Sequence, residues 1–264
     1  MISSVTVQPP DESSAAAAGG VAADAALRHI SDVAVAPDGS LYVVSSFDHQ
    51  VFHIGQDGTV QIAAGTGSAG FSGDGGPATE AELDEPTGVD VGADGTLYIL
   101  DSRRLRIRAV TTDGVITTIG GNETYEASNY DDDPRGVPAT DVYFTASDLV
   151  VDDAGTVYFT SHGAIRAIGP DGIMTTLAGD DANAFGITVD GSDNVYFTQI
   201  DDSQVSVLHK VSERSAPEPA SSDDDQDGAG TPWWAMVIGV LLAAGLVARY
   251  AVRRRRSTRT PPTD

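Results

Sequence analysis

Apolar and polar residues alternate with a period of two in four stretches of the chain that align with one another. In each stretch, two alternating runs flank a short turn rich in Asp, Asn and Gly, and a tyrosine occupies the same place in the second run. Such alternation predicts β-strands, and these turn residues favour the backbone angles of tight hairpins. The four stretches are 32–44, 88–100, 148–160 and 186–198, with Tyr42, Tyr98, Tyr158 and Tyr196 in register.

A second hairpin follows the first in three of the four repeats, with turns at Asp57-Gly58, Asp113-Gly114 and Asp171-Gly172. Each repeat therefore holds four short strands in a meander, which is the unit of a β-propeller blade. The predicted fold class is all-β: a propeller of about four blades, followed by one transmembrane helix.

The segments between repeats are also related, because residues 75–83 match 19–27 and, more loosely, 136–144. This match places residues 2–7 where the outer strand of a blade is expected, while the last repeat has three strands and no fourth. Two interpretations stay open. The N-terminal strand closes the ring against the last blade, which removes exposed sheet edges, or the chain is a truncated fragment of a larger propeller.

Residues 233–252 form an apolar run of the length that crosses a bilayer, roughly 30 Å as a helix. Trp233, Trp234 and Tyr250 stand at its ends as interfacial aromatics do, and Arg253, Arg254, Arg255 and Arg256 follow directly. Because positive flanks stay in the cytoplasm, we expect a single-pass cell-membrane protein with an extracellular N-terminal body and a cytoplasmic C-terminus. Export needs a signal peptide, and residues 1–30 lack its pattern, so we expect the native N-terminus to differ.

These patterns divide the chain into four parts. The propeller covers 1–211, a disordered acidic stalk rich in Pro, Ser and Asp covers 212–232, the membrane helix covers 233–252, and a short basic tail covers 253–264. The stalk has no apolar periodicity and cannot bury enough surface to fold.

Acidic residues dominate the composition, with 39 Asp and Glu against 15 Lys and Arg and a net charge of −24. A body of this charge repels phosphate backbones, so nucleic acid is excluded as a partner. The absence of cysteine excludes disulfides, thiolate metal sites and cysteine nucleophiles.

Residues 65–121 resemble an NHL repeat of the bacterial type. Asp101, Arg106 and Ile107 fall on the Asp and Arg-Ile positions of that family, whereas Ser45, Ser161 and Gln199 replace the Asp in the other repeats. The resemblance implies an NHL-type propeller similar to the sensor ectodomains of bacterial receptor serine/threonine kinases, although no kinase follows here. It also relates the chain to RNA-binding regulators and, more distantly, to propeller lyases and lactonases. Rings of this family commonly have six blades.

Two clusters are candidate sites. Asp101, Arg103, Arg106 and Arg108 form the densest basic group of the body and are a candidate ligand-binding site for an acidic partner or anionic glycan. Internal salt bridging, with Arg106 paired to Asp101 across the turn, is the alternative. The Gly-rich stretch 70–77 contains Asp74, a candidate Ca²⁺ ligand, with a compact inter-blade loop as the alternative. No other cofactor is expected.

No catalytic motif is recognisable, and the five histidines show no metal-ligand spacing. We therefore expect a non-enzymatic binding module for a protein, peptide or cell-wall ligand. The alternatives are a propeller-type lyase or lactonase with a metal in the central channel, and a truncated fragment of a larger propeller. The expected blade core includes Leu27, Val33, Val35, Val43, Val89, Val91, Ile99, Val150 and Phe159.

Overall fold

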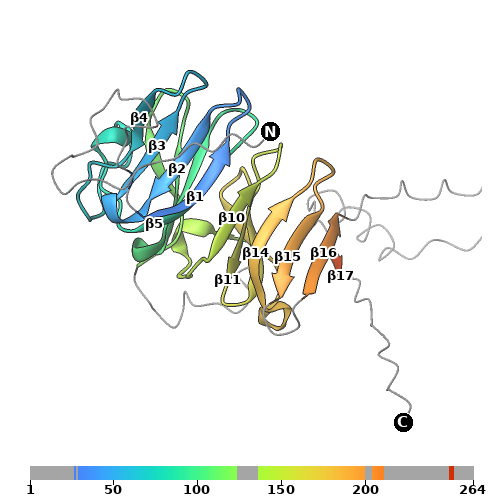
Figure 1. Ribbon diagram of the computed structural model, residues 1–264. Coiled ribbons are helices and arrows are strands. Elements are labelled where there is room, and N and C mark those ends of the chain that lie inside the picture. The colour runs from blue at the N-terminus through green and yellow to red at the C-terminus, as the bar shows by residue number, and fades with distance from the viewer. Residues whose placement is uncertain (1–26, 28, 124–135, 200–203, 211–249, 253–264) are drawn as a thin grey trace, which may run out of the picture.

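The computed structural model describes residues 27, 29–123, 136–199, 204–210 and 250–252. Within them the chain forms four antiparallel sheets, one after another along the sequence, which are the blades of a four-blade β-propeller. Figure 1 shows the blades in chain order, from blue β1 to orange β16. The predicted all-β propeller is confirmed.

Each blade is a meander of neighbouring strands. Blade 1 consists of β1 (Ile30–Val35), β2 (Leu41–Ser45), β3 (Gln50–Ile54) and β4 (Val60–Ala64). Blade 2 consists of β5 (Pro86–Val91), β6 (Leu97–Asp101), β7 (Arg106–Val110) and β8 (Ile116–Gly120). Blade 3 consists of β10 (Asp148–Val151), β11 (Val157–Ser161), β12 (Ala164–Ile168) and β13 (Ile173–Ala178), with β9 (Val137–Pro138) added beside β13. Blade 4 consists of β14 (Ala184–Val189), β15 (Val195–Gln199), β16 (Gln204–Lys210) and β17 (Tyr250–Val252).

The predicted hairpin turns lie where the repeats placed them. Gly39 and Gly95, in the turns before β2 and β6, have φ angles of 84°, which a residue with a side chain rarely adopts. The opposite ends of the same hairpins carry single 3₁₀ turns, η2 (Ser46–Asp48) and η4 (Ser102–Arg104). We call these two ends of the propeller the turn side and the η side.

Blade-to-blade packing buries the core between adjacent sheets. The first strands β1, β5, β10 and β14 lie next to one another in that order and so form the inner part of the arc. Blade 1 packs on blade 2 through residues such as Val44, Val51, Val89 and Ile99, and Leu100 and Phe159 belong to the cluster between blades 2 and 3. Each interface joins the face of one blade to the opposite face of the next.

Aspartates of the inner strands link successive blades. The Asp32, Asp90 and Asp148 carboxylates accept hydrogen bonds of 2.8, 2.8 and 2.9 Å from backbone amides of the next blade. Their donors are Val89, Val151 and Ile187. We call these three contacts the inter-blade latches.

The core prediction was wrong at Val33 and Val35, which are 55% and 67% exposed. Both lie on the face of blade 1 that has no blade packed on it within the described residues. At the other end of the series, Val205 of blade 4 is 72% exposed for the same reason.

The last blade differs from the prediction at its outer edge. Residues 2–7, which the closed-ring hypothesis placed there, lie outside the described residues, so that hypothesis stays a prediction. Instead, β17 pairs with β16 through Lys210 and Tyr250, His209 and Ala251, and Leu208 and Val252. Residues 250–252 are therefore a strand where a helix was expected, because the free edge of β16 offers backbone partners to a β-prone Tyr-Ala-Val segment.

The rest of the predicted anchor, with Trp233, Trp234 and Arg253–Arg256, lies outside the described residues, as does the stalk. Among the residues that are described, none belongs to a helix long and apolar enough to cross a membrane.

Candidate functional site

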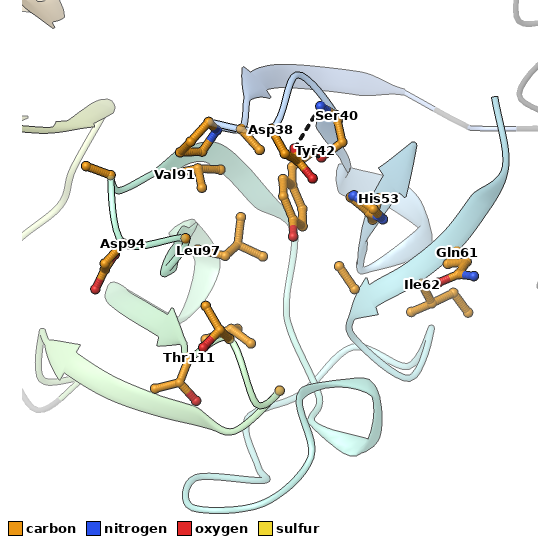
Figure 2. Close-up of a pocket in the computed structure, with 18 residues that line it drawn as sticks. Asp38, Ser40, Tyr42, His53, Gln61, Ile62, Val91, Asp94, Leu97 and Thr111 are labelled. Carbon is orange, nitrogen blue, oxygen red and sulfur yellow. Dashed lines mark hydrogen bonds between the residues drawn. The ribbon is translucent and has the colours of Figure 1, made fainter. Parts of the chain in front are cut away.

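A pocket of about 490 Å³ opens on the turn side between blades 1 and 2 (Figure 2). Blade 1 contributes Tyr42 from β2, His53 from β3 and the turn that contains Asp38. Blade 2 contributes an apolar wall that includes buried Leu97 and Val110. Its volume lies in the range of small-ligand sites, which combine apolar walls with a few convergent polar groups. We call it the blade 1–2 pocket.

The repeat tyrosines differ in what their hydroxyl groups contact. Tyr158 and Tyr196 each donate a hydrogen bond of 3.0 Å to the aspartate that begins their own hairpin turn, Asp152 and Asp190. In blade 1 this turn position is Ala36, so the Tyr42 hydroxyl has no such acceptor. Within the described part of the chain it makes no hydrogen bond, and Figure 2 shows it directed into the pocket.

Asp38 places a negative charge beside Tyr42. Its Oδ1 accepts hydrogen bonds from the Ser40 amide at 2.9 Å and the Ser40 hydroxyl at 2.6 Å. These bonds stabilise the ionised form and lower the pKa of Asp38. Burial, together with the charge of Asp38, raises the pKa of Tyr42. At neutral pH the pocket therefore holds a carboxylate next to a neutral phenol.

His53 completes the polar side of the pocket. Its ring lies 4.9 Å from the Tyr42 ring, centroid to centroid, at an interplanar angle of 41°. The two rings are cross-strand partners, because Tyr42 in β2 pairs with His53 in β3. Pairing across the strands thus places two aromatic faces at one opening.

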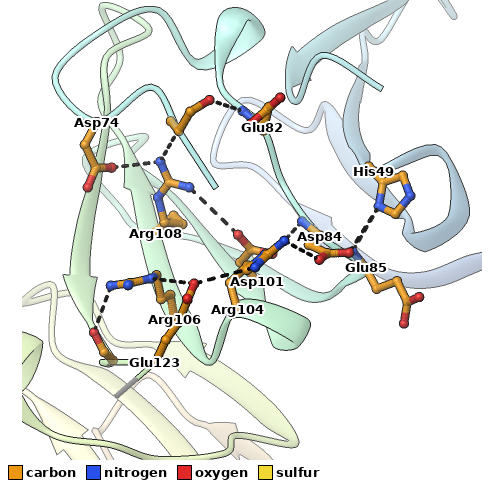
Figure 3. Close-up of polar contacts among 12 residues, drawn as sticks. His49, Asp74, Glu82, Asp84, Glu85, Asp101, Arg104, Arg106, Arg108 and Glu123 are labelled. Carbon is orange, nitrogen blue, oxygen red and sulfur yellow. Dashed lines mark hydrogen bonds and ion pairs between the residues drawn. The ribbon is translucent and has the colours of Figure 1, made fainter. Parts of the chain in front are cut away.

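The residues that the sequence predicted as a ligand site lie elsewhere, on the η side of blade 2 (Figure 3). Arg108 is fully buried. Its Nη2 lies 2.7 Å from Asp74 Oδ1 and donates to the Ser72 carbonyl at 3.0 Å, while its Nη1 lies 3.8 Å from Asp101 Oδ2. Arg108 thus ties the Gly-rich loop to the blade.

The neighbouring charges are also paired. Arg104 lies 3.0 Å from Asp84, Arg103 lies 2.8 Å from Glu85, and the Asp84 amide donates to Asp101 at 2.8 Å. The structure thus brings Asp101, Arg103 and Arg108 into one network of internal ion pairs.

Arg106 faces the same loop through an aromatic contact. Its guanidinium lies 4.0 Å from the centroid of the Phe71 ring, and that of Arg108 lies 4.9 Å from it. Arg106 also donates to the Gly121 carbonyl at 3.2 Å and lies 3.7 Å from Glu123. It is the strand partner of Asp101, yet the ion pair of Asp101 is with Arg108, which lies two residues further along the same face of β7.

Asp101 is the most perturbed acid of this network. Burial raises its pKa to about 7, against the opposing effects of the Asp84 amide and the Arg108 guanidinium. The strength of this desolvation indicates an enclosed structural pair, since both side chains have no exposed surface.

Asp74, the candidate Ca²⁺ ligand, forms an ion pair with Arg108. The described residues contain no group of three or more His, Cys, Asp or Glu side chains placed to hold a metal ion. The metal-dependent lyase or lactonase therefore stays a hypothesis without a ligand set in the described blades.

Sequence reasoning missed Tyr42, Asp38 and His53 as a site. The signal was present in the aligned repeats, where the first turn position is Asp152 and Asp190 in the last two but Ala36 and Gly92 in the first two. The alignment of the repeats does not show how wide the space between two blades is. The corresponding space between blades 2 and 3, beside Tyr98, measures about 140 Å³.

Comparisons with known proteins agree with this fold. The sequence profile of the Teneurin NHL domain matches residues 58–133. Human Teneurin-4 is 33% identical over 103 residues, and the Arabidopsis thaliana chloroplastic protein SUPPRESSOR OF QUENCHING 1 is 34% identical over 92 residues. Both alignments cover 34% of this chain, but they span only 4% and 8% of the relatives.

Among solved structures, a Bacteroides thetaiotaomicron protein of unknown function aligns with a TM-score of 0.50 and 18% identity, over 67% of this chain and 46% of that one. Virginiamycin B lyase from Staphylococcus aureus, in a catalytically inactive form with quinupristin, aligns with a TM-score of 0.48 and 19% identity, over 72% and 56%. At such identities the likeness concerns the fold alone. The described fold is that of a β-propeller, and residues 58–133 are similar to an NHL domain.

Proposed function

We propose that this propeller is a binding module that holds a peptide or protein ligand in the blade 1–2 pocket. The observation that carries the proposal is the Tyr42 hydroxyl, which lacks the internal acceptor of its counterparts Tyr158 and Tyr196 and points into a 490 Å³ space. Unpaired polar groups in a partly apolar pocket are what a ligand completes.

The paired network on the η side supports the same choice of site. Its arginines already contact Asp74, Asp84 and Glu85, so an anionic ligand there would have to displace internal carboxylates. The polar groups of the blade 1–2 pocket need no such displacement.

A peptide array probed with the fluorescently labelled full chain tests this function. Ala93→Trp enlarges an exposed residue at the rim of the pocket, and Asp153→Trp places the same side chain at the equivalent exposed turn position of blade 3. We expect peptides that bind the wild-type chain and the D153W variant but not A93W. Peptides that bind A93W as well as the wild type would place the ligand elsewhere, and an array without any binder would contradict peptide binding.

We also propose that residues 233–252 anchor the chain in the cell membrane with the propeller outside, in a state in which Tyr250–Val252 have left the edge of β16. Support comes from the apolar run, its aromatic ends and the four arginines that follow. Because the chain has no cysteine, single cysteines can report the topology. With a membrane-impermeant maleimide on intact cells, Ser192→Cys in an exposed turn should be labelled and Ser257→Cys in the tail should not. Labelling of S257C would contradict this orientation.

A further inference from the structure

From the chemistry of the blade 1–2 pocket, and resting on the binding function proposed above, we infer that its ligand is the guanidinium of an arginine side chain of a peptide or protein partner. The inference adds a ligand class to that function. Three features of the pocket carry it: its charge, its aromatic faces and its difference from the other inter-blade spaces.

The charge of the pocket is negative. Asp38 stands at its rim, and both of its hydrogen bonds with Ser40 fall on Oδ1, which leaves Oδ2 for a ligand. Asp94 lines the opposite side and is ionised too, because hydrogen bonds from Thr96 lower its pKa. No Lys or Arg stands among the described residues that line the pocket. A cation therefore meets attraction here, reinforced by the overall charge of −24.

The shape of the polar groups favours a planar cation. The Tyr42 and His53 rings provide adjacent aromatic faces, on which guanidinium groups stack. A guanidinium carries five N–H donors, and Tyr42 and Asp38, both from blade 1, offer acceptor oxygens in the lining of the pocket. A lysine ammonium is more strongly hydrated and has no planar face, so it fits this arrangement less well.

The other inter-blade spaces do not offer these features. Beside Tyr98 the space is about 140 Å³ and is lined mainly by Ala109, Ile119, Val157 and glycines. Between blades 3 and 4 the Tyr158 hydroxyl is already bonded to Asp152. Among the described blades, a space of ligand size, a free carboxylate oxygen (Asp38 Oδ2) and a phenol without an internal hydrogen bond (Tyr42) occur together between blades 1 and 2.

Fluorescence anisotropy with three labelled peptides tests the inference. The peptides are Gly-Ser nonapeptides with a central arginine, citrulline or lysine. Citrulline keeps the size and planarity of arginine without its charge. We expect the arginine peptide to bind the full chain at least about tenfold more tightly than the citrulline peptide, since charge-assisted hydrogen bonds are roughly twice as strong as neutral ones.

Asp38→Asn should abolish that preference by lowering arginine-peptide affinity about tenfold. Asp57→Asn is the matched control, because Asp57 makes the same contacts with Thr59 in the second hairpin turn of blade 1 but does not line the pocket. Tyr42→Phe should weaken the arginine peptide without changing the fold. Equal affinity for the citrulline and arginine peptides would overturn the guanidinium inference, while the proposed binding of a peptide in the blade 1–2 pocket would still stand. Failure of all three peptides, together with an array signal unaffected by A93W, would overturn the proposed function as well.

Discussion

The Asp32 carboxylate in the inner strand of blade 1 accepts a hydrogen bond from the Val89 amide in the inner strand of blade 2, at 2.8 Å between Oδ2 and N. Its other oxygen accepts from the Val33 amide, also at 2.8 Å. Asp90 and Asp148 repeat this double contact in the next two interfaces. One carboxylate per interface thus holds two blades in register where their strands lie closest together.

These latches predict a stability effect that is specific to the acceptor. Asp32→Ala should lower the free energy of unfolding by about 1–2 kcal/mol, because it leaves the Val89 amide without its partner. Asp32→Asn keeps an acceptor oxygen and should cost less. Urea unfolding measures both, with Glu80→Ala, an exposed carboxylate of η3 (Ala78–Glu80), as the control. An equal effect of D32A and E80A would contradict the latch.

The different contacts of the repeat tyrosines predict different effects on stability when each is replaced by phenylalanine. Tyr158→Phe removes the hydroxyl that donates to buried Asp152 and should lower the free energy of unfolding by about 1 kcal/mol or more. Tyr42→Phe removes a hydroxyl that makes no internal hydrogen bond in the described chain and should leave the stability nearly unchanged. Thermal unfolding of the two variants compares them, and a loss of similar size in both would indicate an internal partner for Tyr42.

The buried pair of Asp101 and Arg108 predicts non-additive effects. Arg108→Met should cost roughly 3–5 kcal/mol, since it removes the guanidinium that contacts Asp101, Asp74 and the Ser72 carbonyl. Combining it with Asp101→Leu should cost clearly less than the sum of the single substitutions, because the double variant leaves neither charge buried. A double-mutant cycle at pH 8 measures this coupling, and strict additivity would exclude an energetic link between the two side chains.

Asp101 also predicts a pH dependence. Its folded-state pKa is about 7, above the value near 3.9 of an unfolded aspartate. Between about pH 4 and pH 7 the folded chain therefore holds a proton that the unfolded chain releases. This group's contribution to stability falls as the pH rises through that window, by at most about 1.4 kcal/mol per pH unit.

Asp101→Asn mimics the protonated carboxyl and removes this titration. The stability of the variant relative to wild type should accordingly increase between pH 5 and pH 8 in urea unfolding. A difference that stays constant over this range would show that Asp101 titrates outside it.

Sequence periodicity was sufficient for the fold because each blade is a local unit. The Tyr-anchored hairpins and the Asp-Gly turns specify strand pairs over a dozen residues, and adjacent repeats pack as they follow one another. The exposure of Val33 and Val35 could not be predicted from periodicity, since both valines follow the blade pattern. They are exposed because no described blade packs on that face of blade 1.

The sites depended on distances that the sequence does not contain. Arg106 and Arg108 look equivalent in the pattern, yet only Arg108 contacts the Asp101 carboxylate, because its side chain is enclosed under the Gly-rich loop. Likewise Tyr42 and Tyr98 align and both lack an aspartate at the first turn position, but the space beside Tyr42 is more than three times as large. Packing between blades decides both differences.

The most direct test of the ligand site is an NMR titration of the ¹⁵N-labelled full chain with the arginine peptide. The pocket lies at the turn side and the Asp101 network at the other end of β6, so the two locations give separate sets of amide shifts. We expect the largest changes at Ser40, Tyr42, Val91 and Thr111, all around the blade 1–2 pocket. Changes centred instead on Asp84, Arg104 and Arg106 would contradict binding in the blade 1–2 pocket and would place the ligand on the η side of blade 2.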